Sequence, residues 1–201
     1  MALDVSSSVD DREYLLQVEG LAQAFEDAEV QRALFQIPNA HVWLQVFEWS
    51  GVHDQTIVID WQAVTGPGDV AHIVATLRGH GRSVHNAATG LGRALDFARR
   101  QFDRAPRCDL RKVDVSGDGQ SNVGIPPQQL YTTTEFGEIT VNGLAILSDE
   151  RALARYYQSF VIRGPGAFLE IADDFDAYSA AIRRKLIREL GVPQLGQREA
   201  P

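Results

Sequence analysis

Three oxygen-bearing side chains stand at alternate positions near the start of the printed sequence. Asp4, Ser6 and Ser8 form a D-x-S-x-S pattern where a short apolar run gives way to helical spacing. Alternate residues of an extended segment point to the same side, so one carboxylate and two hydroxyls can converge there. Oxygen ligands suit a hard cation, and few carboxylates suit Mg²⁺ better than Ca²⁺, because Mg²⁺ keeps several waters. The competing interpretation is a Ser-rich loop that only caps the following helix.

Two further oxygen side chains occupy similar positions later in the chain. Thr89 stands ahead of a helical pattern in ATGLGRAL, and Asp118 follows an apolar strand pattern in KVDVSGDGQSN. Each has a simpler interpretation, Thr89 as a helix N-cap and Asp118 with Gly119 as a turn. The joint arrangement of the three segments favours one shared site.

Alternating strand and helix patterns must position these residues. Apolar or β-rich runs predict strands over 2–6, 42–49, 56–61, 110–116, 139–147 and 167–171. Apolar spacing and local start signals predict helices over 10–25, 68–77, 89–102, 126–137, 149–160 and 174–190. The polar stretch after Trp49 predicts a hairpin between the second and third strands.

These patterns predict an α/β class with a doubly wound, Rossmann-like fold. We expect a mostly parallel six-stranded sheet with one antiparallel strand and helices on both faces. One domain is expected over residues 1–190, with a tail at 191–201. Ligands of such folds bind beyond the carboxyl ends of the parallel strands, and the predicted strand directions bring the loops with Asp4, Thr89 and Asp118 to that edge.

Composition excludes several classes of function. The 201 residues carry 19 Lys and Arg against 27 Asp and Glu, a net charge of -8, which disfavours a nucleic-acid partner and favours a cationic ligand. The lone Cys108 excludes an intramolecular disulfide and a Cys-based zinc site. No apolar run approaches the roughly 18 residues of a membrane helix, so no membrane insertion is expected.

Two other features have a structural and a functional interpretation. Trp49 lies at the strand end nearest the expected site, either as an exposed binding anchor or as a packed aromatic residue. Arg183, Arg184, Lys185 and Arg188 make the last helix basic, and we expect them to form a solvated face.

The motifs together resemble the von Willebrand factor type A (VWA) domain with its metal-ion-dependent adhesion site (MIDAS). The resemblance rests on DVSSS, on Thr89 ahead of Gly92 and the Ala94-Leu95 pair, and on Asp118-Gly119 after an apolar strand. Further motifs are similar to a bacterial branch of that family, the domain of unknown function 1194 (DUF1194): FEWSG (47–51), DVSGDG (114–119), VNGLAI (141–146), GPGAF (164–168) and AIRRKLIREL (181–190). The resemblance covers nearly the whole chain.

The resemblance implies that Ser6, Ser8 and Thr89 supply hydroxyl ligands, while Asp4 and Asp118 ligate directly or through water. It implies Mg²⁺ as the metal, with Mn²⁺ or Ca²⁺ as alternatives. Two carboxylates roughly cancel a divalent charge, and if one acts through water the open side attracts an anionic oxygen.

The expected function is therefore a non-enzymatic, adhesion-type module that binds an acidic side chain of a partner protein. A metal-dependent hydrolase or phosphoryl-transfer enzyme and a scaffold with a vestigial metal site are the alternatives.

The resemblance also implies a periplasmic or secreted protein, although the start MALDVSSS shows no export signal and leaves a cytoplasmic location as the alternative. The first strand of the family is longer than the two residues between Met1 and Asp4, so we expect a trimmed chain or a misassigned start. The sequence sets no oligomeric state.

Overall fold

The computed structural model describes residues 1–36, 41–85, 87–148 and 150–191. Within these residues, the centre of the fold is a six-stranded sheet in the order β3-β2-β1-β4-β5-β6. The strands are β1 (Ala2–Asp4), β2 (Val42–Trp49), β3 (Gln55–Val64), β4 (Arg111–Gly117), β5 (Ile139–Ile146) and β6 (Leu169–Ala172). Strands β2 and β3 form an antiparallel hairpin, and the other neighbouring pairs are parallel. The expected fold class is confirmed.

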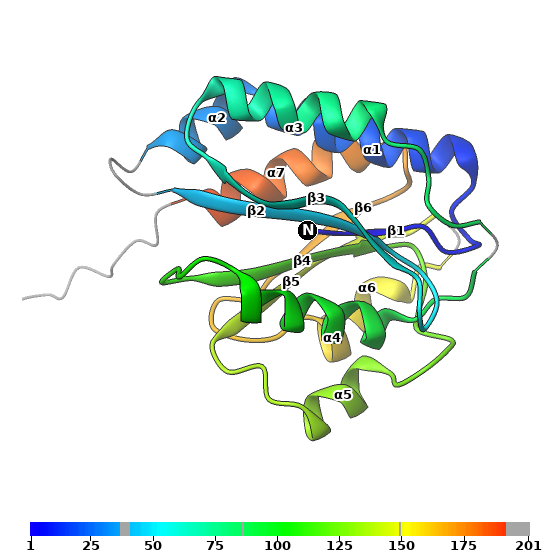
Figure 1. The fold of residues 1–201 in the computed structure, drawn as a ribbon. Helices are drawn as coiled ribbons and strands as arrows, with labels where there is room; N and C mark the ends of the chain where they lie inside the picture. The colour runs from blue at the N-terminus through cyan, green and yellow to red at the C-terminus, as the bar shows by residue number, and fades with distance from the viewer. Residues whose placement is uncertain (37–40, 86, 149, 192–201) are drawn as a thin grey trace, which may run out of the picture.

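Helices cover both faces of the sheet (Figure 1). One face carries α1 (Asp11–Glu26), α2 (Ala28–Phe35), α3 (Pro67–Gly79) and α7 (Tyr178–Leu190). The other carries α4 (Leu91–Gln101), α5 (Pro127–Thr133) and α6 (Leu153–Tyr156). A 3₁₀ turn (Phe102–Arg104) follows α4, and a π-helical turn (Tyr157–Val161) follows α6. Each face has its own hydrophobic cluster, as expected for a sheet buried on both sides.

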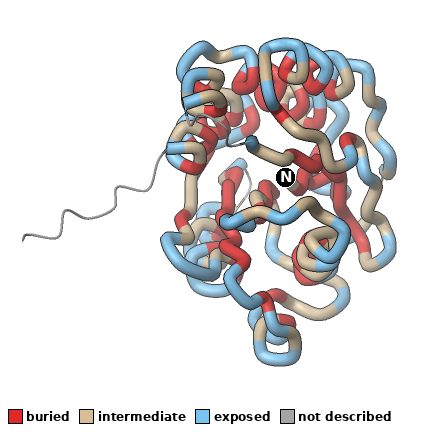
Figure 2. Tube along the Cα trace, turned by 60° about the vertical axis from the view of Figure 1, so that its left-hand side comes forward, coloured by how far each residue is buried: buried red, intermediate tan, exposed pale blue. Residues whose placement is uncertain are grey.

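Burial follows the position of each strand in the sheet. Every residue of β5 is buried, which explains its near-continuous apolar sequence. The edge strand β3 has only two buried positions, Ile59 and Val64. Figure 2 shows that buried segments lie inside the molecule and exposed segments on its outer turns.

Several predicted element boundaries were wrong. The short helix α2 was not predicted, because only Asp27 separates it from α1; this residue ends α1 and caps α2, accepting hydrogen bonds from the N–H groups of Glu29 and Val30. The helix predicted over 149–160 consists of the short α6 and the π-helical turn. The helix predicted from residue 89 begins at Leu91. The helix predicted over 126–137 ends at Thr133, the one predicted from 174 begins at Tyr178, and the predicted tail beyond Gly191 lies outside the described residues.

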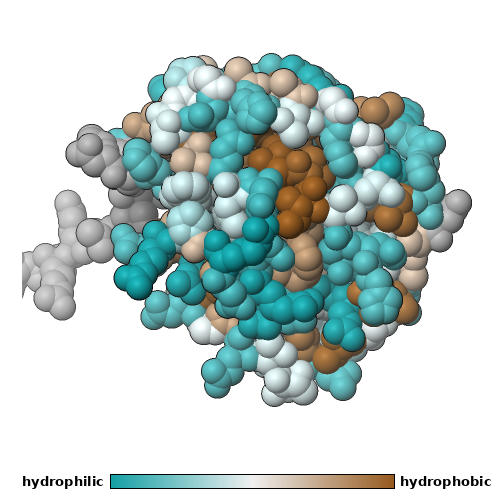
Figure 3. All heavy atoms as spheres, viewed as in Figure 1, coloured by the Kyte–Doolittle hydropathy of each residue, from teal (hydrophilic) through white to brown (hydrophobic). Residues whose placement is uncertain are grey.

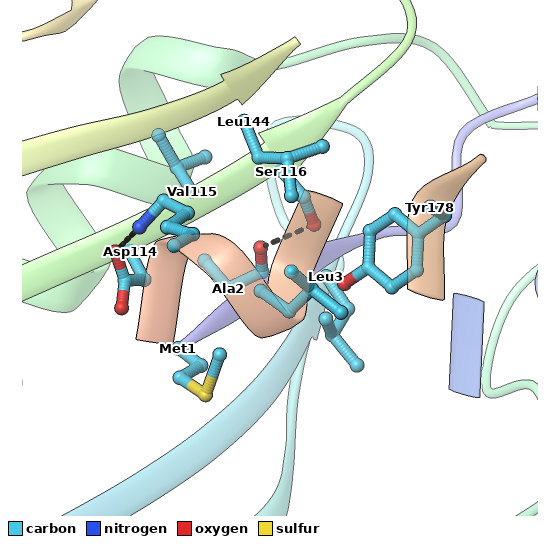
Figure 4. A pocket seen from close by; sticks show the side chains of 10 residues that line it. Met1, Ala2, Leu3, Asp114, Val115, Ser116, Leu144 and Tyr178 are labelled. Carbon is cyan, nitrogen blue, oxygen red and sulfur yellow. Dashed lines mark hydrogen bonds and ion pairs between the residues drawn. The ribbon is translucent and has the colours of Figure 1, made fainter. Parts of the chain in front are cut away.

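The structure decides the two open interpretations. Trp49 is fully buried, so it is a packed aromatic residue. The expectation of a solvated Lys185 was wrong, because its side chain is 1% exposed and forms ion pairs with Asp114 of β4 and Glu189 of α7. Asn142 of β5 also donates to Glu189. A small cavity at the start of β1 is lined by Asp114, Lys185 and Ser116 among others. Figure 4 shows this cavity, beside which the Ser116 hydroxyl donates to the carbonyl of Ala2.

A larger cavity of about 620 Å³ lies next to this small cavity. It is lined by the first halves of β2 and β4, because β1 pairs only from Ala2 onward, opposite Phe47 of β2 and Val115 of β4. This cavity lies toward the amino ends of the parallel strands, away from the edge where ligands of such folds bind.

The molecular surface carries both hydrophilic and hydrophobic residues. Figure 3 shows a mainly hydrophilic face with a hydrophobic area near its middle, where β2 and β3 run in the same view of Figure 1, and smaller hydrophobic areas toward the right and the lower edge. Among the described helices, none combines the length and the apolar character needed to cross a bilayer.

Candidate metal centre

Three loops meet at the carboxyl edge of the sheet. They are the β1–α1 loop (5–10), the α3–α4 loop (80–90) and the β4–α5 loop (118–126). The Ser7 N–H donates to the Ala87 carbonyl at 2.8 Å, which joins the first loop to the second. Thr89 and Asn122 join the second loop to the third: the Thr89 N–H donates to Asn122 Oδ1, and the Asn122 N–H donates to the Thr89 carbonyl, both at 2.9 Å.

Four of the five predicted site residues form one chain of hydrogen bonds. The Ser6 N–H donates to Asp4 Oδ1 at 2.8 Å, and the hydroxyls of Ser6 and Ser8 lie 3.2 Å apart. Ser8 Oγ then donates to Asp118 Oδ1 at 2.7 Å, across 110 residues of sequence. The strand predicted over 2–6 ends at Asp4, and a turn in which the Val9 N–H donates to the Ser6 carbonyl follows it. This turn, and not the predicted extended alternation, brings the polar groups of Ser6 and Ser8 together.

The hydroxyl of Thr89 lies near the hydroxyl of Ser8. A Cβ atom built on Gly119 would lie 3.9 Å from both Ser8 Oγ and Thr89 Oγ1. The two hydroxyls therefore flank the space that the missing side chain of Gly119 leaves open. The structure brings all five predicted residues to one edge of the sheet.

The helix-cap interpretations of Ser6, Ser8 and Thr89 were wrong. Helix α1 is capped by Asp10, whose carboxylate accepts from the Glu13 N–H in a capping box, so Ser6 and Ser8 are not its cap. Helix α4 has Gly90 as its N-cap with no side-chain cap, so the hydroxyl of Thr89 does not cap it. The hydroxyls are thus available for another role.

The two carboxylates of the site are buried close to each other. Asp4 is fully buried and Asp118 is 5% exposed. Burial raises the pKa of Asp4 to about 7, and the negative charge of Asp118 adds to this increase. A bound divalent cation would remove the conflict, because it favours the ionised form of both carboxylates.

Sequence reasoning missed the groups behind Asp4. Asp4 Oδ2, Tyr157 Oη and Trp49 Nε1 are buried without a hydrogen-bond partner among the described residues. A Cβ atom on Gly117 would lie 2.7 Å from both Asp4 Oδ2 and Tyr157 Oη, and 3.2 Å from the Trp49 ring. Burial and the charge of Asp4 hold the pKa of Tyr157 well above its usual value. Gly117 in the DVSGDG motif was the available signal, since Gly permits such a close approach.

The donor set suits a hard divalent cation. Asp4 and Asp118 offer carboxylates, and Ser6, Ser8 and Thr89 offer hydroxyls. Among the residues described, no group of three or more His, Cys, Asp or Glu side chains could hold a metal. A metal held at this place would therefore need hydroxyl ligands, which disfavours a transition-metal site built from imidazole and thiolate.

The fold is the one that von Willebrand factor type A (VWA) domains have. A von Willebrand factor type A structure from Catenulispora acidiphila matches with a TM-score of 0.65 and 18% identity over 94% of this chain and 42% of that chain. Proximal thread matrix protein 1 from the mussel byssus, solved with a zinc-occupied MIDAS motif, matches with a TM-score of 0.64 and 16% identity over 94% and 46%. The pilus adhesin SpaC from Lactobacillus rhamnosus GG matches with a TM-score of 0.63 and 12% identity over 94% and 30%.

By sequence, the chain belongs to the family described as "Protein of unknown function (DUF1194)", whose model matches residues 1–194. The expected resemblance is confirmed. The chain spans less than half of the length of the three structures named above, whose low identities establish the common fold alone. No curated protein matches the chain in sequence.

Proposed function

We propose that this protein is a metal-dependent protein-binding module of the MIDAS type. The observation that carries the proposal is the hydrogen-bonded series from Asp4 through Ser6 and Ser8 to Asp118, with Thr89 facing the same open space beside Gly119. These groups come from three separate segments of the chain. A single capping motif or a single turn would not require groups from three segments.

Mg²⁺ is the proposed metal, because the donors are few, all are oxygen, and water can complete the shell. Ser6, Ser8 and Thr89 would provide hydroxyl oxygens, and Asp4 and Asp118 would act directly or through water. The zinc-occupied MIDAS motif of proximal thread matrix protein 1 supports a metal at this place in the fold. When bound, the metal would supply an electron-poor position that attracts an anionic oxygen.

An acidic side chain of a partner protein is the proposed ligand. The chain has a net charge of -8, so a Glu or Asp ligand would meet general repulsion without a local positive charge. Binding would therefore depend on the metal. We propose that the protein binds this side chain and catalyses no reaction on it.

Metal binding is tested by calorimetric titration of Mg²⁺ and Mn²⁺ into the wild type and Thr89→Val. This change removes one hydroxyl and keeps the side-chain shape, so binding should weaken about tenfold or more while the thermal stability of the metal-free protein changes little. Thr56→Val on the edge strand β3 is the matched control and should bind as the wild type does. Equal heats from Thr89→Val and the wild type contradict the proposed site.

Partner recognition is tested with immobilised peptides that carry a single Glu, each paired with its Gln counterpart. The proposal expects retention of Glu peptides with Mg²⁺, and loss of retention with EDTA or with Gln. Retention that persists in EDTA contradicts a metal-dependent module. Phosphate-ester or carboxylic-ester turnover that requires Asp4 contradicts the non-enzymatic part.

A further inference from the structure

The α3–α4 loop contains a buried arginine that the proposed site does not include. The Arg82 side chain is only 7% exposed. Its Nη2 group donates to the carbonyls of Val5 and Ser6, each at 3.0 Å, and its Nε group donates to the carbonyl of Val84 at 2.9 Å. One guanidinium thus connects the loop that carries Thr89 to the loop that carries Ser6 and Ser8.

The backbone carbonyls are the main partners of this guanidinium. Its carboxylate partner Asp11 is 80% exposed, so solvent screens that ion pair and leaves it a minor contribution. The planar, forked guanidinium can bind several carbonyls in a fixed geometry, which the single ammonium group of Lys cannot reproduce.

The carbonyls that Arg82 binds are next to the proposed ligands. Val5 and Ser6 lie between Asp4 and Ser8, so holding their carbonyls fixes the backbone from which the ligands project. The Ser7 N–H in the same turn donates to Ala87, two residues before Thr89. These bonds join the backbone of the segment that carries the two serines to the backbone of the segment that precedes Thr89.

We infer that Arg82 is a positioning residue of the metal site: it holds the α3–α4 loop against the β1–α1 loop so that Thr89 faces Ser6 and Ser8. This inference rests on the proposed function. Groups that orient metal ligands without touching the metal commonly change metal affinity by 10- to 100-fold when they are removed.

The charge of Arg82 and its positioning role predict opposite changes in Mn²⁺ affinity when the side chain is replaced. The inference can therefore be tested. A positive charge near a cation site weakens cation binding, so its removal by Arg82→Met should strengthen Mn²⁺ binding if only charge matters. If position matters, Arg82→Met should weaken Mn²⁺ binding at least tenfold. Arg82→Lys keeps the charge but loses the fork, and should weaken binding by an intermediate factor.

The experiment measures Mn²⁺ affinity by electron paramagnetic resonance in the wild type, Arg82→Met, Arg82→Lys and the control Arg12→Met. Arg12 is an exposed residue on α1 that pairs with Asp176, so its variant has the same charge change and should bind within twofold of the wild type. Hydrogen exchange of the Ser7 amide, measured in EDTA, reports the contact between the loops without metal. This exchange should become at least tenfold faster in Arg82→Met.

Each outcome supports or overturns the assignment. Mn²⁺ binding of Arg82→Met within twofold of the wild type, or tighter, overturns it, as does unchanged exchange of the Ser7 amide. If Arg82→Met does not fold, Arg82→Lys is decisive: unchanged affinity overturns the assignment, and weaker affinity with faster Ser7 exchange supports it. Absence of Mn²⁺ binding in the wild type overturns the proposed function and, with it, this role of Arg82.

Discussion

Replacing Asp4 by Asn should separate the stability of the metal-free protein from its ability to bind metal. The Asp4 carboxyl is fully buried, and its pKa is raised from 3.8 to about 7 by burial and by Asp118. At about 1.4 kcal/mol for each pKa unit, ionising this group in the folded protein costs about 4 kcal/mol at pH 8. The side chain of Asn keeps an acceptor for the Ser6 N–H, adds a donor on the side of Tyr157, and carries no charge.

The sign of the effect follows from proton binding. Because the folded pKa of Asp4 is raised, the folded state holds a proton that the unfolded state loses between pH 4 and pH 7. The contribution of Asp4 to stability is therefore fully present below pH 4 and is lost as the pH rises to about 7. In EDTA at pH 8, Asp4→Asn should raise the free energy of unfolding by about 2–4 kcal/mol, or the melting temperature by about 5–10 °C. At pH 5 the difference should fall to less than half.

Calorimetric and urea unfolding at pH 5 and pH 8, with EDTA and with Mg²⁺, measure these differences. Asp103→Asn in the exposed 3₁₀ turn is the control and should show neither change. Mg²⁺ should raise the melting temperature of the wild type and not that of Asp4→Asn. A variant that is less stable than the wild type in EDTA at pH 8 would refute the reasoning.

Three other substitutions test the structure around the site and the core. Ser8→Ala removes the donor to Asp118 Oδ1, and should cost about 1–2 kcal/mol in urea unfolding and weaken Mn²⁺ binding about tenfold; unchanged affinity contradicts its role as a ligand. Gly117→Ala places a Cβ atom 2.7 Å from Asp4 Oδ2, and should lower the free energy of unfolding by about 1–3 kcal/mol; a neutral result contradicts the close packing. Lys185→Met leaves the carboxylates of Asp114 and Glu189 without their buried cation, and should cost about 3–5 kcal/mol in urea unfolding at pH 7; an unchanged stability contradicts the importance of these ion pairs.

The fold was predictable because its signals are local in sequence. Each strand has an apolar or β-rich run, and the hairpin has a polar turn after Trp49. The helix α2 was missed because its start signal is Asp27, one residue after α1 ends, so the two helices are difficult to separate by apolar spacing. The charge of Lys185 led to a surface prediction, since its partners Asp114 and Glu189 come together only in the folded protein.

The site was predictable in its residues and not in its surroundings. The oxygen side chains at Asp4, Thr89 and Asp118 occur where strands end or where helices begin. Such positions can be recognised from the pattern of apolar residues in the sequence. Tyr157 has no such signal, because its position behind Asp4 depends on how the π-helical turn packs under β4 and β5. Arg82 is one of several polar residues in its loop, and its burial depends on carbonyls about 76 residues away in sequence.

The central place of β1 has a consequence for the order of folding. Its three residues lie between β2 and β4, and Ala2 is opposite Val115. More than 100 residues lie between Asp4 at the end of β1 and Arg111 at the start of β4, so this neighbour is synthesised long after β1. Contacts that close such long loops form late and slow down folding. Metal binding by nascent chains should therefore be undetectable until β4 has left the ribosome. The chain length at which binding first appears would show when β4 pairs with β1.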